Sequence, residues 1–112
     1  MIEKIIYDYL KSKLTIPVCM EMPEKPSIPM ILIEKTAGGM DDHVYEATIA
    51  IQSYGKTLYK SAEINEMVKN TMLDAIELDK VSEVKINSDY NFTDTERKLY
   101  RYQAVFDIKY LK

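Results

Sequence analysis

The segment EKTAGGMDDH, residues 34–43, holds the side chains of this chain that are best suited to chemistry. It combines the only adjacent glycines, the only adjacent acids and the only histidine: Gly38, Gly39, Asp41, Asp42 and His43. Glycine-rich loops can cradle phosphate, carboxylates with an imidazole can ligate a metal, and a histidine beside an acid can move protons. The same residues can also form the tip of a β-hairpin, where glycine supplies positive φ for a turn or bulge.

The spacing of these residues favours the hairpin tip. A Walker loop needs GxxxxGK[ST], and a dinucleotide fingerprint needs GxGxxG at the start of a helix; the segment contains neither. A metal site needs three or four ligands, so one histidine and two carboxylates suffice only if a second subunit contributes. We therefore expect a structural hairpin without cofactor or metal. The alternative is a metal-dependent hydrolase or nuclease that uses Asp41, Asp42 and His43 across subunits.

Nucleophilic catalysis has little support in the sequence. A catalytic His43 would need a nucleophile and an orienting group, or an activated water, and the sequence identifies none of these. Cys19, the single cysteine, follows Val18 and precedes Met20, and we interpret it as a small buried core residue. One cysteine cannot form an internal disulfide or a Cys-type zinc site within one chain. The sequence thus predicts a protein that is not an enzyme.

Hydrophobic periodicity predicts the elements that position the segment. Apolar residues at helical spacing predict an amphipathic helix over residues 2–13. The four prolines between residues 17 and 29 predict a stiff connector with a short edge strand near Val18–Met20. Residues 30–36 are continuously apolar at their start and β-branched, and residues 44–54 alternate with a period of two, which predicts two strands.

The second half of the chain predicts another helix and two more strands. A long helix begins at Thr57, its expected N-cap, and ends near Leu78. A short strand at residues 84–86 precedes a polar loop at residues 87–98. The last and longest strand covers residues 99–110 and alternates between an apolar and a polar face.

This order of elements predicts one α+β domain over residues 1–112. We expect a mostly antiparallel sheet of four to five strands, with two helices packed on one face. The net charge of −3 and the lack of a basic run disfavour attraction to nucleic acid. No segment approaches the ~20 apolar residues that span a bilayer, and residues 1–14 do not resemble a signal peptide. We expect an intracellular protein without membrane or direct nucleic-acid partners; a small binding module is a further alternative.

Two aromatic residues, Tyr90 and Phe92, interrupt the polar loop predicted at residues 87–98. Such rings either fold back onto the core or serve as anchors for a partner. We expect contact with a partner, because a loop this polar has little to hold it against its own core.

Four segments of the chain resemble the small tail-terminator, or tail-completion, proteins of long-tailed bacteriophages and prophages. They are PVCMEMPEKP, PMILIEKTAGG, HVYEATIAIQSYGKTLYKSAEINEMV and SDYNFTDTERKLYRYQAVFDIKY. The similarity covers nearly the whole chain, from Pro17 to Tyr110, and SDYNFTDTERKLYRYQAVFDI is its most specific part. Cys19 departs from the pattern, because a larger residue is expected there. The family is also described as minor tail or head–tail joining proteins.

The resemblance implies a structural role. Such α+β subunits form homo-oligomeric rings, commonly hexamers, that cap the tail tube, stop its polymerisation and join it to the head-completion or connector protein. It also implies a location in the host bacterial cytoplasm during assembly and in the virion tail afterwards. Exposure and composition, rather than matched family residues, place the expected interface at Gly38, Gly39, Asp41, Asp42, His43, Asn87, Asp89, Tyr90, Asn91 and Phe92.

Overall fold

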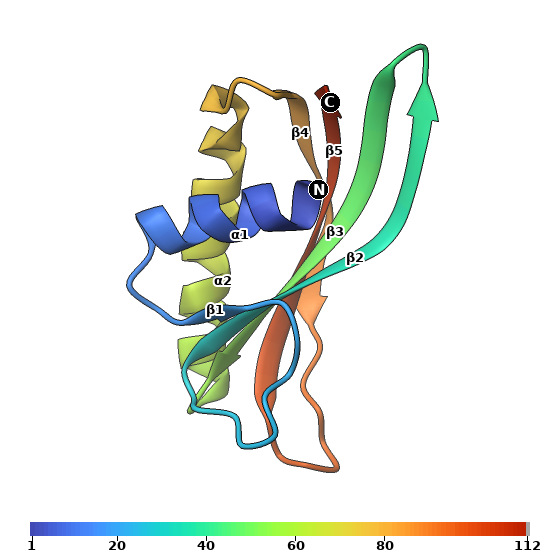
Figure 1. The fold of residues 1–112 in the computed structure, drawn as a ribbon. Helices are drawn as coiled ribbons and strands as arrows, with labels where there is room; N and C mark the ends of the chain where they lie inside the picture. The colour runs from blue at the N-terminus through green and yellow to red at the C-terminus, as the bar shows by residue number, and fades with distance from the viewer. Residues whose placement is uncertain (112) are drawn as a thin grey trace.

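The computed structural model describes residues 1–111 and shows two helices on one face of a five-stranded sheet (Figure 1). In chain order the elements are α1 (Ile2–Lys13), β1 (Val18–Cys19), β2 (Met30–Asp41), β3 (Val44–Gly55), α2 (Leu58–Leu73), the 3₁₀ turn η1 (Asp74–Glu77), β4 (Val81–Asn91) and β5 (Tyr100–Leu111). The strand order is β1-β2-β3-β5-β4. β1 runs parallel to β2, and the other neighbouring strands are antiparallel. The predicted α+β class is confirmed.

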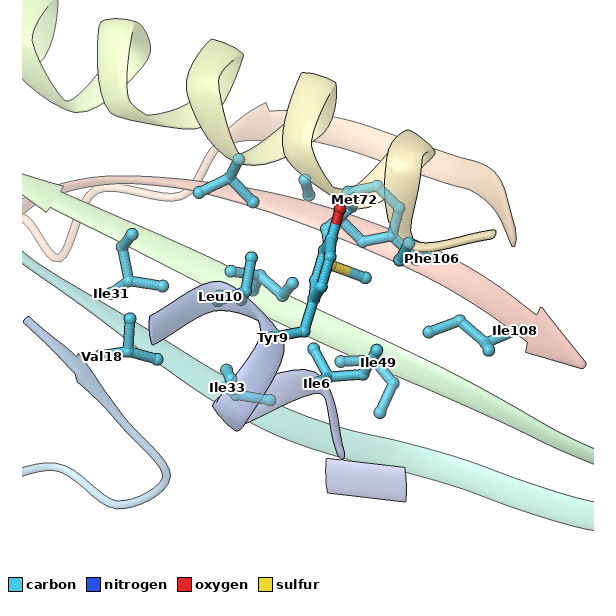
Figure 2. Packing of buried hydrophobic residues seen from close by; sticks show 14 of the residues in the cluster. Ile6, Tyr9, Leu10, Val18, Ile31, Ile33, Ile49, Met72, Phe106 and Ile108 are labelled. Carbon is cyan, nitrogen blue, oxygen red and sulfur yellow. The ribbon is translucent and has the colours of Figure 1, made fainter. Parts of the chain in front are cut away.

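The core lies between the helices and the sheet. Ile6, Tyr9 and Leu10 of α1 repeat at helical spacing and are buried, as the periodicity predicted. Figure 2 shows them against isoleucines of β2 and β3 and against Phe106 of β5. The Tyr9 hydroxyl donates a hydrogen bond to the carbonyl oxygen of Thr71 at 2.8 Å, which ties α1 to α2.

The helix α2 begins where the sequence predicted and ends earlier. Thr57 is the N-cap, and its side-chain oxygen accepts a hydrogen bond from the Lys60 amide at 3.1 Å. The buried face of α2 is not purely apolar, because Leu58 is exposed whereas Ser61 and Asn65 are buried. A small residue is buried at position 61 because α2 lies directly against the end of β3 there, at Gly55.

The strand β4 is much longer than the short strand predicted at residues 84–86. The prediction of a loop from residue 87 onward is wrong for Asn87–Asn91, which belong to β4, and Ser88–Asn91 pair with β5. Shifts in register between Val81 and Glu83 and between Ile86 and Ser88 interrupt the alternation of side chains between the two faces. The local sequence pattern therefore does not reveal the full length of the strand. The connection to β5 is therefore limited to residues 92–99.

The molecule is elongated, with extents of 44 × 25 × 24 Å. The β2–β3 hairpin reaches well away from the helices (Figure 1). Within residues 1–111, no helix has both the length and the apolar character needed to cross a membrane.

Candidate functional site

The hairpin tip is formed by Asp42 and His43, which connect β2 to β3. Their φ angles are 47° and 68°, and Asp41 pairs with Val44 on either side of them. Two central residues with positive φ are what a tight two-residue hairpin requires, and aspartate adopts this conformation more readily than most residues. The predicted hairpin is confirmed, and its turn lies four residues beyond the start of the glycine pair.

The two glycines do not make the turn, so the prediction that they supply positive φ is wrong. Gly38 and Gly39 lie within β2, opposite Ala47 and Glu46, and neither has a positive φ. A Cβ on Gly38 would lie 2.7 Å from Cε of Lys35, whereas a Cβ on Gly39 would meet nothing within 4 Å. At Gly38 the missing side chain therefore leaves room for the Lys35 side chain.

The acids and the histidine of the tip do not assemble into a metal site with other residues of the same subunit. Within residues 1–111 there is no group of three or more His, Cys, Asp or Glu side chains that could hold a metal ion. Asp41, Asp42 and His43 are all exposed. The cross-subunit metal site stays a hypothesis that needs a second copy.

Cys19 is only partly buried, not fully buried as predicted. Its Sγ donates a hydrogen bond to the carbonyl oxygen of Ile31 at 3.4 Å, and burial raises the pKa of the thiol, which disfavours the nucleophilic thiolate. Cys19 pairs with Leu32, and Asp41 lies nine positions beyond Leu32 along β2. That is roughly 30 Å of strand, so Cys19 and His43 do not form a catalytic pair.

The second group of predicted interface residues lies on β4 or directly after it, and its Asp89 is tied to the rest of the fold: Asn87, Asp89, Tyr90, Asn91 and Phe92. The Asp89 carboxylate accepts hydrogen bonds from Asn65 Nδ2 at 2.9 Å and from Lys69 Nζ at 3.2 Å. The pKa of Lys69 is raised, chiefly by its hydrogen bond to Glu66, with Asp89 adding to the effect. These contacts hold the edge strand β4 against α2.

The sheet face opposite the helices carries a chain of hydrogen bonds that the sequence analysis missed. Arg101 Nη1 donates to the Tyr54 hydroxyl at 3.0 Å, and this hydroxyl donates to Gln52 Oε1 at 2.9 Å. Gln52 Nε2 then donates to Gln103 Oε1 at 2.9 Å, and Gln103 Nε2 donates to the Tyr90 hydroxyl. Tyr54, Gln52 and Gln103 are buried, although both helices of residues 1–111 lie on the other face of the sheet (Figure 1).

Phe92 closes this chain of contacts into a ring. Its side chain packs edge-to-face on Tyr90, with 5.8 Å between the ring centroids. The guanidinium of Arg101 lies over both the Phe92 ring and the Tyr54 ring. Its carbon is 4.3 Å from the Phe92 centroid and 5.8 Å from the Tyr54 centroid. Tyr90 and Phe92 nevertheless remain 41% and 39% exposed. We call Gln52, Tyr54, Tyr90, Phe92, Arg101 and Gln103 the aromatic–amide ring.

A groove of about 440 Å³ lies on the same face, nearer the hairpin tip. It is lined by the small residues Ala37–Gly39 of β2 and by charged residues of β3, β4 and β5. Lys109 Nζ lies 3.5 Å from Glu83 and 3.9 Å from Glu46, and Lys85 Nζ lies 3.3 Å from Glu83. The lysines lower the pKa of Glu83, the hydrogen bond from Lys85 having the largest effect. The charges are thus mutually paired, and the groove presents a mixed polar surface.

The structure does not bring the two predicted groups together. His43 and its neighbours lie where Val44 pairs with Leu111, whereas Tyr90 pairs with Gln103 towards the opposite end of the sheet. In the sequence, the feature that could have indicated the aromatic–amide ring is a pair of glutamines, Gln52 and Gln103. They lie on the polar faces of the strands predicted over residues 44–54 and 99–110. No family model matches the chain, and no curated protein matches it in sequence.

Proposed function

We propose that this protein is a structural subunit of a bacteriophage or prophage tail that forms a ring, ends polymerisation of the tail tube and joins the tube to the head connector. The proposal starts from the resemblance of four segments of the sequence to tail-terminator proteins. The observation that supports it best is the outer half of the β2–β3 hairpin, where residues 34–43 are all exposed.

The exposure of this part of β2 concerns both faces of the strand. Successive residues of a strand point to opposite faces, so a run of eight exposed strand residues, Glu34–Asp41, lacks cover on either side. The partner strand β3 is held by β5 along its whole length, but within the described residues 1–111 this part of β2 has no second neighbouring strand. A hairpin that its own subunit leaves uncovered is well suited to contact neighbouring subunits.

The mechanism is geometric. A surface that joins a different surface of the next copy produces a closed ring when the rotation per subunit divides a full turn. In the proposed ring, one side reproduces the contacts of the tail tube and the other side offers no further tube site, so growth stops. The half-exposed rings of Tyr90 and Phe92 supply a second contact at the opposite end of the sheet. The role includes no reaction and no cofactor.

The experiment combines assembly in vitro with tail length in a phage that carries the gene. We expect native mass spectrometry and negative-stain electron microscopy to show closed rings, either of the purified protein or after addition of the tail-tube protein. Deletion of the gene should give overlong tails that lack heads. Ala37→Glu with Gly39→Glu should reproduce the deletion while leaving the circular-dichroism melt unchanged, because both positions are exposed.

A matched control carries the same charges elsewhere on the surface. Tyr59→Glu with Met67→Glu changes two exposed residues of α2, and it should leave ring formation and tail length unchanged. A protein that stays monomeric with the tail tube present, together with tails of normal length after gene deletion, would refute the proposal.

A further inference from the structure

The strand β1 occupies only the beginning of the outer edge of β2. It pairs with Ile31 and Leu32, and the chain then turns away after Cys19. Among residues 1–111, no other strand lies on this side of β2. The edge is therefore open from Ile33 to Asp41.

The backbone groups that point out of this edge follow from the pairing. The Ile31 amide donates to the Pro17 carbonyl at 2.8 Å, so Ile31 faces outward, away from β3. Alternation then turns the N–H and C=O groups of Ile33 and Lys35 outward as well. Beyond the register shift at residue 36, the tight hairpin pair Asp41–Val44 sets the alternation, which turns Gly38 and Met40 outward. These groups form a ladder that lacks its partner strand.

A groove of about 460 Å³, lined by both apolar and charged residues, lies against the start of this open edge, and we call it the methionine groove. Its apolar lining includes Met1, Met20, Met22 and Leu32, and Met40 is exposed farther along the same edge. Four of the seven methionines of the chain thus gather along one edge. Methionine side chains are flexible and polarizable, and they adapt to varied apolar groups at binding surfaces.

The charges around the groove are mainly acidic. Glu3, Glu21 and Glu34 line it, and Lys35 is the one basic residue of the lining. A ligand that fills the groove with an apolar side chain would gain from a positive charge next to that side chain.

The other edge of the sheet is better protected against an added strand. β4 contains two shifts of register, and its Asp89 is engaged by Asn65 and Lys69 of α2. Bulges and charged residues are the usual devices that prevent an edge from accepting another strand. In contrast, β2 has a single shift of register, at residue 36, and beyond it presents Ala37, Gly38 and Gly39, which leave room for a close approach.

We propose that the open edge of β2 and the methionine groove together bind an extended segment of a partner protein, in which apolar side chains alternate with Lys or Arg. The segment adds a strand beside β2 beyond the end of β1 and places an apolar side chain among Met1, Met20 and Met22. Backbone hydrogen bonds supply affinity, and the groove selects the side chain, as in other cases of strand addition. This inference concerns the backbone edge of β2, whereas the ring contact proposed above uses the two faces of the hairpin, so it does not depend on the ring.

The test uses a defined probe, the blocked octapeptide Ac-KLKVKLKT-NH2, titrated into ¹⁵N-labelled protein. We expect saturable shifts of the amide resonances of Ile33, Lys35, Gly38 and Met40. Two further peptides carry N-methyl groups at the odd or at the even positions, and only one of the two should bind, because a strand turns alternate N–H groups towards its neighbour. Equal binding of all three peptides, or absence of saturable binding, would overturn the proposal.

Variants of the protein separate the groove from the edge. Met20→Lys with Met22→Lys should weaken binding about tenfold or more, because it removes apolar side chains from the groove and repels the basic peptide, and Met40→Pro should weaken it by removing an outward N–H. Met67→Lys on α2 is the control and should bind as the unchanged protein does. Unchanged binding by both the double methionine variant of the groove and Met40→Pro would contradict the proposal.

Two other occupants are distinguished by the same samples. The acidic peptide Ac-ELEVELET-NH2 should not bind, and equal binding would refute the assigned charge. If sedimentation equilibrium showed self-association that Met40→Pro abolished, the edge would bind a second copy, and the partner segment proposed here would be wrong. Ring assembly is measured separately by native mass spectrometry, so the ring could fail while the peptide result stands.

Discussion

The guanidinium carbon of Arg101 lies 4.3 Å from the centroid of the Phe92 ring, and the same side chain donates a hydrogen bond to the Phe92 carbonyl oxygen. This double contact fixes Phe92 immediately after the end of β4. The reason given for expecting Tyr90 and Phe92 to depend on a partner, a mobile polar loop, is therefore wrong. Contact of these rings with a partner stays a prediction, which now rests on their partial exposure.

The first prediction concerns this cation–π contact. Phe92→Ala should lower the free energy of unfolding by about 1–2 kcal/mol, because the apolar area of a half-buried ring and its contact with Arg101 are lost. A double-mutant cycle with Arg101→Met, followed by urea denaturation, should give a coupling energy of about 0.5–1 kcal/mol. Strictly additive effects would show that the contact contributes nothing.

The second prediction concerns the buried amides. Gln103→Met should cost about 1–3 kcal/mol, because Gln52 Nε2 then lacks its acceptor in a buried position. The double variant Gln52→Met with Gln103→Met should be more stable than the sum of the single variants predicts, since it removes both halves of the pair. Thermal melts of the four proteins measure this. Additive changes in stability would show that water satisfies the amide that is left without its partner in each single variant.

The third prediction compares two glycines of the same hairpin. Gly55→Ala should destabilise the protein by several kcal/mol, because a Cβ would lie 2.8 Å from the Lys60 carbonyl carbon and 2.9 Å from Ser61 Cα. Gly39→Ala is the matched control, with nothing within 4 Å of its Cβ and no positive φ, and should change stability by less than about 1 kcal/mol. Similar melting temperatures for the two variants would show that α2 can move away from β3.

The fourth prediction concerns the hairpin turn. His43→Gly should stabilise the protein by about 0.5–1 kcal/mol, because His43 has a φ of 68° and an Asp-Gly pair is favoured in a two-residue hairpin turn. His43→Val should destabilise it, since a β-branched residue is poorly tolerated at positive φ. Chemical denaturation gives both values. A destabilised glycine variant would indicate that the imidazole makes a contact of its own.

The fifth prediction concerns alkaline pH. Burial raises the pKa of Tyr9, and the nearby Glu77 and Asp74 raise it further. The folded protein therefore keeps the phenolic proton where the unfolded chain has lost it. This stabilising contribution is complete below the unfolded pKa of about 10 and is lost as the pH rises through the higher folded pKa.

Tyr9→Phe removes this titration together with the hydrogen bond to Thr71. The variant should be about 1 kcal/mol less stable at pH 7 and should lose less stability than the unchanged protein between pH 9 and 11. Identical alkaline slopes for the variant and the unchanged protein would contradict the assignment to Tyr9.

Local patterns in the sequence determined a large part of the fold. The spacing of Ile6, Tyr9 and Leu10 predicted α1, the hydroxyl of Thr57 predicted the start of α2, and alternation over residues 44–54 predicted β3. These signals are reliable because a helix face, a cap and a strand face depend on residues within a few positions of each other.

Only the tertiary structure decided which polar residues became buried and which edges stayed open. Gln52 and Gln103 are neighbours because β3 pairs with β5 across 51 positions of the chain, and β4 reaches Asn91 because β5 supplies its hydrogen bonds. The open edge of β2 exists because β1 stops at Cys19. Strand partners, unlike strand faces, are set by contacts between distant segments, and the local period of a sequence does not encode them.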